Sequence, residues 1–175
     1  MNGENKINIV LAGQGNSGKS TVFNFLTGLH QHIGNWAGKT IEKREGTLFY
    51  RDHIVDVLDL PGIYSLTTVS DEELISREYI IKQNPDWVIN VVDSTNLERS
   101  LIFTLQLLEL ERPVIIALNM TDLAKRKGIT VDAKKLQNIL GVQVIPTVAS
   151  RGSGLTRIID RVIDLKDAKP TRKVH

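Results

Sequence analysis

Hydrophobic and polar residues alternate in blocks along this chain, with short apolar runs separated by longer segments of mixed character. Five of these runs read as strands, and most of them are nearly continuous in Val, Ile and Leu, which is typical of strands buried on both faces of a parallel sheet. These predicted strands are Ile7 to Ala12, Ile54 to Leu60, Trp87 to Val92, Val114 to Leu118 and Val142 to Thr147. Because amphipathic segments lie between them, the pattern predicts an α/β fold with helices on both faces of the sheet.

One further strand is predicted from a different pattern. Apolar and charged residues alternate from Thr40 to Tyr50, which predicts an antiparallel edge strand, joined to the next strand by a tight turn near Arg51 and Asp52. Helices are predicted at Lys19 to Leu26, Asp71 to Lys82, Leu97 to Glu111, Ala133 to Leu140 and Gly154 to Leu165. We therefore expect three layers, with a six-stranded, mostly parallel sheet, one antiparallel edge strand and about five helices.

Length and composition favour a single soluble domain. The chain has 175 residues, of which 41% are hydrophobic, and this is enough for one core. We assign residues 1–166 to the domain and residues 167–175 to a polar tail or the start of a linker. The net charge of +2 gives no reason to expect a nucleic-acid partner, and the absence of cysteine excludes disulfides and thiolate metal ligands. The longest apolar runs are far shorter than the roughly 20 residues that cross a bilayer.

A phosphate-binding motif follows the first predicted strand. The run from Gly13 to Ser20 fits G-x-x-x-x-G-K-[ST] and opens a predicted helix, which is the context that this motif requires. Its backbone N–H groups would surround the phosphates, Lys19 would reach the β and γ oxygens, and the Ser20 hydroxyl would bind Mg²⁺. The predicted nucleotide-binding residues here are Gly13, Gln14, Gly15, Asn16, Ser17, Gly18, Lys19, Ser20 and Thr21.

Two further segments are candidates for the metal and the γ-phosphate. Asp59 ends a predicted strand at the edge where open α/β sheets bind ligands, and it could hold Mg²⁺ through water, while the Gly62 N–H could sense the γ-phosphate. The polar segment from His30 to Lys39 resembles a loop that orders only around GTP, with Thr40 completing the Mg²⁺ shell. His30 and His32 alone lack the further ligands of a tight metal site.

The base is expected to be recognised after the fifth and sixth predicted strands. The Asp122 carboxylate can accept hydrogen bonds from N1–H and N2–H₂ of guanine, which adenine cannot offer, while Asn119 braces the loop. The Ala149 N–H would point toward the guanine O6. Predicted base-site residues are Asn119, Met120, Asp122, Val148, Ala149 and Ser150. Together with the phosphate motif, they predict a P-loop GTPase fold that uses GTP, GDP and Mg²⁺.

The connecting segments resemble those of the G domain of ferrous iron transport protein B. The resemblance rests on Ile33 to Thr40 with Glu42, Asp59 to Leu66, Asn90 to Asp93 with Asn96 to Arg99, and Met120 in the base motif. It implies a helical regulatory domain and a membrane domain that moves Fe²⁺ beyond this chain, with the full protein in the cell membrane and this domain on its cytoplasmic face. The chain departs from the family's usual residues at Gly15, Ala37, Lys39 and Val148.

The expected reaction is slow attack of water on the γ-phosphate. Ras-type GTPases place a glutamine directly after the glycine of the second switch, whereas this chain has Ile63, which cannot orient water. Residues predicted to contribute to catalysis are Asn16, Lys19, Thr40 and Gly62. The resemblance also implies a K⁺ site formed by Asn16 with the carbonyls of Gly34 and Trp36. The alternatives are a nucleotide-gated binding module with incidental hydrolysis and a stand-alone GTPase of ribosome or RNA maturation.

Overall fold

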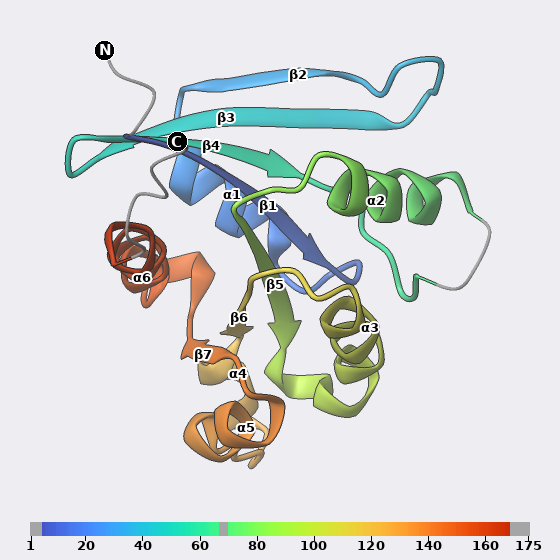
Figure 1. Cartoon of the computed structure of the whole chain (residues 1–175). Coiled ribbons are helices and arrows are strands. Elements are labelled where there is room, and N and C mark those ends of the chain that lie inside the picture. Colours follow the sequence, from blue (N-terminus) through green and yellow to red (C-terminus); the bar gives the residue numbers. More distant parts are fainter. Residues whose placement is uncertain (1–4, 67–69, 169–175) are drawn as a thin grey trace.

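The fold is built on one seven-stranded sheet, seen in a computed structural model that describes residues 5–66 and 70–168 (Figure 1). The strands lie in the order β2-β3-β4-β1-β5-β6-β7. The bounds are β1 Lys6–Gly13, β2 Gln31–Asn35, β3 Glu42–Tyr50, β4 His53–Asp59, β5 Trp87–Asp93, β6 Val114–Asn119 and β7 Gln143–Pro146. The five strands from β4 to β7 in this order are mutually parallel, and β3 runs antiparallel to both β4 and β2.

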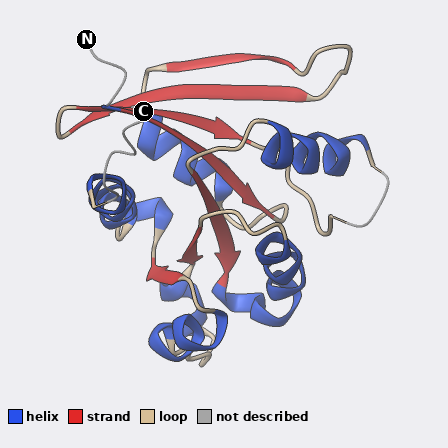
Figure 2. Cartoon of the chain, in the orientation of Figure 1, coloured by secondary structure: helices blue, strands red, loops and turns tan. Residues whose placement is uncertain are grey.

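Helices flank the sheet on both faces (Figure 2). Their bounds are α1 Lys19–Thr27, α2 Asp71–Lys82, α3 Leu97–Glu109, α4 Thr121–Arg126, α5 Ala133–Leu140 and α6 Leu155–Asp167, with 3₁₀ segments at Ser94–Asn96 and Ala149–Arg151. Residues of α1 and α6 form one apolar core with the sheet, and residues of α2, α3 and α5 form another. The α/β class and its three layers are therefore confirmed.

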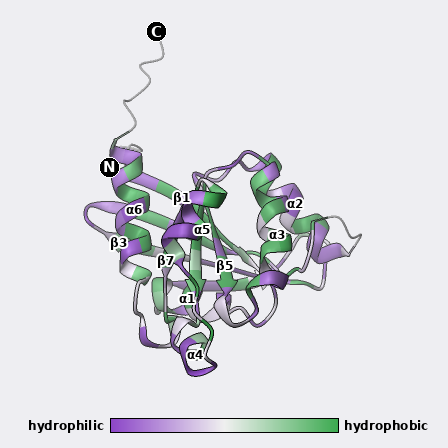
Figure 3. Ribbon diagram, turned by 90° about the horizontal axis from the view of Figure 1, so that it is seen from below, coloured by the Kyte–Doolittle hydropathy of each residue, from purple (hydrophilic) through white to green (hydrophobic). Residues whose placement is uncertain are grey.

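The first strand shows how one apolar run serves both cores. Ile7, Ile9 and Leu11 belong to the core under α1 and α6, whereas Val10 and Ala12 belong to the core under α2 and α3. Because successive side chains of a strand point to opposite faces, both faces of β1 must be apolar. Figure 3 shows the strands in the middle of the molecule coloured mainly as hydrophobic, while α3 and α6 carry both colours. Because β1 is packed on both faces, its carboxyl end, where the phosphate-binding motif begins, has a fixed position in the fold.

The predicted strand count was wrong by one. Residues Gln31–Asn35, which we expected to be a loop, pair with β3 in register from Gln31 opposite Gly46 to Asn35 opposite Glu42. As an edge strand, β2 is held by backbone hydrogen bonds to one neighbour, and its side chains are exposed or half-buried, so no apolar pattern is required. The described residues also contain a sixth helix, α4, whose six residues are too few to show a clear helical period.

The ends of the domain lie together. The Lys166 ammonium donates a hydrogen bond to the carbonyl of Lys6, which joins the end of α6 to the start of β1. The predicted tail lies mostly outside the described residues, since α6 continues to Asp167 and the description ends at residue 168. Within the described ranges, none of the helices combines the length and the apolar character needed to span a bilayer.

Candidate nucleotide-binding site

The predicted phosphate, metal and base segments meet at one edge of the sheet. They follow the carboxyl ends of β1, β4, β6 and β7, which all point the same way because these strands are parallel. Three pockets, of about 450, 250 and 270 Å³, lie along this edge. Open α/β sheets place their ligands at this edge. The topology of the sheet therefore gathers the predicted residues that follow β1, β4, β6 and β7.

The three pockets share residues and form one continuous cleft. The P-loop pocket is lined by Gln14, Gly15, Asn16, Gly18, Lys19, Ser20, Thr21, Gly62 and Met120. The Asp59 pocket is lined by Lys19, Ser20, Ile41, Glu42, Arg44, Asp59, Leu60, Pro61 and Gly62. The Asp122 pocket is lined by Gly18, Thr21, Asn119, Met120, Asp122, Leu123, Arg126, Val148, Ala149 and Ser150. An elongated ligand could contact all three pockets at once.

The backbone of the P-loop adopts conformations that suit anion binding. Asn16 and Gly18 have positive φ angles of 65° and 89°, and α1 begins directly afterwards at Lys19. Positive φ is tolerated best by Gly and Asn, so the sequence fits the geometry. A β-carbon at Gly18 would also collide with the amide nitrogen of Asn119. The unpaired N–H groups at the start of α1 make this a suitable place for a phosphate.

Lys19 and Asp59 form a buried ion pair in the Asp59 pocket. Their side chains are only 9% and 7% exposed. Burial raises the pKa of the Asp59 carboxyl above its ordinary value, while the positive charges of Lys19 and Arg44 act in the opposite direction. Ser20 lines the same pocket, so a hydroxyl and a carboxylate oxygen are available together. Oxygen donors of these types are the ones that Mg²⁺ prefers, and the residues present fit that ion.

The predicted first switch, His30 to Lys39 followed by Thr40, lies away from the P-loop. Gly34 is within β2, and Trp36 begins the turn to β3, where its carbonyl accepts a hydrogen bond of 2.9 Å from the Lys39 N–H. The Trp36 ring packs edge-on against Tyr79 of α2, and the Lys39 ammonium pairs with Asp71 at 2.5 Å. Thr40 is exposed and lines none of the three pockets of the cleft. The predicted Mg²⁺ ligand Thr40 and the predicted K⁺ ligands Gly34 and Trp36 are thus not assembled with Asn16 here.

The predicted second switch, the segment from Gly62 to Leu66 that follows β4, in contrast touches the P-loop. A β-carbon at Gly62 would lie 3.3 Å from the Gly15 nitrogen, and the Ile63 N–H donates to the Gly13 carbonyl at 3.2 Å. The Ile63 side chain is 3% exposed and packs in the core with α2 and α3. The position that carries a glutamine in Ras-type GTPases therefore holds an apolar core residue that points away from the cleft.

Asn119 joins the phosphate and base segments. Its amide nitrogen donates to the Ser17 carbonyl at 2.9 Å, and its amide oxygen accepts from the Thr147 hydroxyl at 3.1 Å and the Ala149 N–H at 2.9 Å. The Ser94 hydroxyl donates to the Asn119 carbonyl at 2.6 Å. These hydrogen bonds connect the loop after β6 to the P-loop and to the segment after β7, which is the kind of contact that a bracing role for Asn119 requires. The Ala149 N–H, which we predicted to face a guanine oxygen, is directed to Asn119 in this structure.

Asp122 faces the base pocket from the first turn of α4. Its carboxylate lies 3.8 Å from the guanidinium of Arg126, one helical turn later. Met120 precedes α4 with a φ of 61°, and its side chain passes close to Gly18, so it lines both the P-loop pocket and the Asp122 pocket. Val148 carries a backbone bridge to Ser153, and Ser150 is exposed at the rim.

Sequence reasoning missed several residues of the cleft. The most important is Arg44, which lies opposite Asp59 in the β3–β4 ladder and lines the Asp59 pocket. The signal was present, because a two-residue turn at Arg51 and Asp52 makes Tyr50 face His53 and therefore fixes Arg44 opposite Asp59. Arg126 was also missed, although it lies one helical turn after Asp122. Thr147 and Ser94, which hold Asn119, were missed because their contacts join distant segments that no local pattern encodes.

A sheet of this order, with a phosphate-type turn after β1 and a base pocket after β6, is the architecture of a P-loop GTPase domain. Comparison with known proteins identifies the family within this class. A family model described as ferrous iron transport protein B matches residues 7–162. This match covers most of the chain, and the chain belongs to the ferrous iron transport protein B family, within which it corresponds to the G domain.

Individual relatives agree with this assignment. The Fe(2+) transporter FeoB of Salmonella typhimurium is 49% identical over 163 residues, which cover 89% of this chain and 21% of that protein. The FeoB G-domain of Methanococcus jannaschii is 43% identical with a TM-score of 0.81, over 93% of this chain and 98% of that one. The cytosolic domain of T. maritima FeoB in GDP form I is 40% identical with a TM-score of 0.88, over 94% and 64% of the two chains. This chain thus spans about a fifth of the Salmonella relative's length.

Proposed function

We propose that this chain binds GTP and GDP with Mg²⁺ and hydrolyses GTP slowly, as the nucleotide-dependent regulatory domain of a ferrous-iron transporter. The observation that carries the proposal is the continuous cleft, in which Gly18, Thr21 and Met120 connect the phosphate-binding segment to the Asp122 pocket. The GDP-bound T. maritima relative supports the choice of guanine nucleotide. The family assignment favours iron transport over the alternative of RNA maturation.

The proposed chemistry uses residues of this chain in defined roles. Lys19 would exchange its partner Asp59 for the β and γ oxygens, and the backbone N–H groups of the P-loop and Gly62 would stabilise the charge that develops on them. Asp59 and Ser20 would hold Mg²⁺, which supplies positive charge to the same oxygens. The switch residue Thr40 would have to leave its exposed position to join them. With Ile63 in the core, no side chain at that position orients the attacking water, which supports a slow rate.

Calorimetry and turnover assays test this proposal. Titration with GDP, GTP and ATP should give guanine nucleotides an affinity at least about a hundredfold higher, because adenine lacks the N1–H and the C2 amine that would donate to the Asp122 carboxylate. GTP turnover should require Mg²⁺. Equal affinity for ATP would refute the base assignment, and a protein that binds GTP without any turnover would be a nucleotide-gated binding module, the remaining alternative.

Activation of GTP hydrolysis by K⁺ is the most detailed part of the proposal. It is supported by Asn16, a polar amide held at positive φ beside the P-loop pocket. A K⁺ ion there would place charge near the phosphates, once Gly34 and Trp36 had moved to complete its shell. Turnover in K⁺ should exceed turnover in Na⁺ at equal ionic strength by about tenfold, which requires only about 1.4 kcal/mol. Asn16→Ala should abolish that difference, and equal rates in both salts for the wild type would refute the potassium site.

A further inference from the structure

The second switch contacts two neighbouring elements, the P-loop and α3. On the P-loop side, Gly62 packs against Gly15 and the Ile63 N–H bonds to the Gly13 carbonyl. On the other side, the Gln106 amide oxygen of α3 accepts a hydrogen bond of 2.7 Å from the Leu66 N–H. The residues between Ile63 and Leu66 are therefore anchored to the P-loop at one end and to α3 at the other.

Arg99, in the first turns of α3, contacts both the second switch and the P-loop. Its guanidinium carbon lies 4.6 Å from the centre of the Tyr64 ring, which is the geometry of a cation–π contact. Its carbonyl accepts a hydrogen bond of 2.8 Å from the Gln14 amide, whose residue is only 8% exposed. One residue of α3 is thus bonded to the P-loop through its main chain and to the switch through its side chain.

Tyr64 occupies the space beside Gly15 in the P-loop. A β-carbon at Gly15 would lie 3.3 Å from the Tyr64 hydroxyl oxygen, so the phenol passes close to the P-loop backbone. Tyr64 is 48% exposed, and the Arg99 guanidinium lies over its ring. The Arg99 guanidinium and the P-loop backbone at Gly15 therefore both contact Tyr64, two residues after Gly62.

We propose that Arg99 is a positioning residue for GTP hydrolysis, which holds Tyr64 on the P-loop and thereby keeps the Gly62 N–H at the P-loop pocket. This inference rests on the proposed GTPase function. Gly62 is the group of the second switch that lines the P-loop pocket, and its predicted contact is with the γ-phosphate, which GDP lacks. Loss of the stack should therefore slow turnover without weakening GDP binding, because binding energy is lost only where the γ-phosphate is present.

The size of the effect follows from the exposure of the stack. Cation–π contacts at exposed sites are weak, so Arg99→Ala should lower kcat by about two- to fivefold, with the Kd for GDP changed by less than about a factor of two. Tyr64→Leu retains the Arg99 charge but removes the ring face, and it should cause the same loss. Tyr64→Phe keeps the ring and should lose much less. The double variant should be no slower than either single variant, because both remove the same contact.

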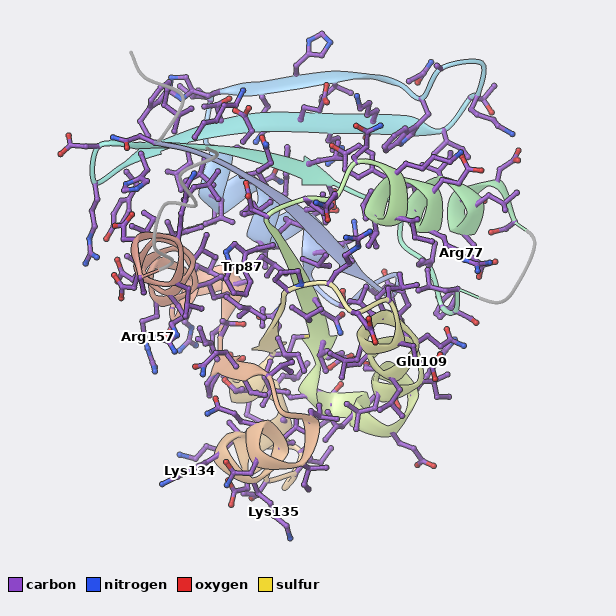
Figure 4. The ribbon with its side chains drawn as sticks, in the orientation of Figure 1. Arg77, Trp87, Glu109, Lys134, Lys135 and Arg157 are labelled. Atoms are coloured by element: carbon purple, nitrogen blue, oxygen red, sulfur yellow. The ribbon has the colours of Figure 1, made fainter. Side chains whose placement is uncertain are left out.

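A matched control is available on another helix. Arg157 is exposed on α6, and Figure 4 shows it directed outward from that helix, away from α3. Arg157→Ala should leave kcat unchanged, which separates a local effect from a general change of surface charge. All variants should have the Tm of the wild type within a few degrees, because removal of one exposed contact changes stability little.

Three results would overturn the inference. The first is a wild-type kcat for Arg99→Ala. The second is a slow Arg99→Ala with a normal Tyr64→Leu, which would mean that the Arg99 charge acts on the phosphates directly. The third is a parallel loss of GDP affinity and kcat, which would mean that the P-loop itself is damaged.

Amide exchange of the nucleotide-free protein gives a readout that does not need hydrolysis. The N–H groups of residues 62–66 should exchange about two- to fivefold faster in Arg99→Ala than in the wild type, since the same contact restrains them. Unchanged exchange would also refute the positioning role. If the wild type proves unable to hydrolyse GTP, the proposed function fails, while exchange still tests whether Arg99 restrains the second switch.

Discussion

The two halves of the cleft are organised differently. On the base side, Asn119 is buried and bonded to the P-loop, to Thr147 and to the 3₁₀ turn at Ala149. On the switch side, the turn after β2 is held to α2 by the contacts of Trp36 with Tyr79 and of Lys39 with Asp71. Under the proposed function, the base side is held in place before the nucleotide binds, whereas the switch side must rearrange before it can contribute to catalysis.

This difference has a physical cause. The base segments follow β6 and β7, two parallel neighbours whose buried residues belong to both cores. The first switch lies at the sheet edge, where β2 has one neighbour and exposed side chains. Segments with few buried contacts open at low cost and are the ones that move in switching. Substitutions on the two sides should consequently affect different steps, binding on one side and turnover on the other.

The largest expected effect concerns the base contact itself. Asp122→Asn should weaken GDP binding by about a thousandfold, because two hydrogen bonds to a charged acceptor are lost and one amide N–H then faces a donor. Xanthosine diphosphate, whose C2 oxygen accepts where guanine donates, should bind the variant better than GDP does. Calorimetry with both nucleotides measures this exchange of preference. An unchanged preference for GDP would show that another group reads the base.

The bracing network should matter for stability as well as for binding. Asn119→Ala leaves the Thr147 hydroxyl, the Ala149 N–H and the Ser17 carbonyl without their partner. We expect the free energy of unfolding to fall by about 3 kcal/mol, since buried polar groups without partners are costly. Urea denaturation gives this value. Asn138→Ala, at an exposed position of α5, is the matched control and should change stability by less than about 1 kcal/mol.

Turnover should depend on a residue that lies outside the cleft in this structure. Thr40→Ala should lower kcat by about tenfold and change the Kd for GDP by less than about twofold, because the hydroxyl is needed only after the first switch has moved. Single-turnover kinetics and GDP titration measure the two quantities. Thr156, exposed on α6, supplies the control Thr156→Ala. Equal losses in GDP affinity and kcat would mean that the two halves of the cleft are not separable.

The smallest expected effect concerns the ion pair that joins the first switch to α2. Lys39 and Asp71 are both substantially exposed, with 40% and 54% of their side chains accessible, so their pairing is weak. Lys39→Val should speed GTP turnover by about two- to fivefold at low salt, because the switch is released more easily, and high salt should remove the difference. Turnover assays at two ionic strengths measure this. Slower turnover in the variant would indicate that Lys39 assists catalysis.

Most of the fold followed from local patterns. The central strands and the long helices were predicted because both cores demand apolar residues at positions that show a strand or helix period. The edge strand β2 was not predicted because backbone hydrogen bonds with β3 stabilise it. Such pairing does not require a pattern of apolar side chains when those side chains remain in solvent. The short helix α4 escaped for a similar reason, since six residues carry too little periodic information.

The sequence by itself determined which groups are available at this site, because the glycine-rich turn, Asp59, Asn119 and Asp122 each require a particular side chain or backbone freedom at a fixed place after a strand. Only the tertiary structure decided how those groups are paired. The ion pair of Lys19 with Asp59, the bonds of Asn119 with three segments, and the contacts of Arg99 with Tyr64 and Gln14 join residues from separate elements. Contacts of this kind depend on strand order and packing, which no local stretch of sequence specifies.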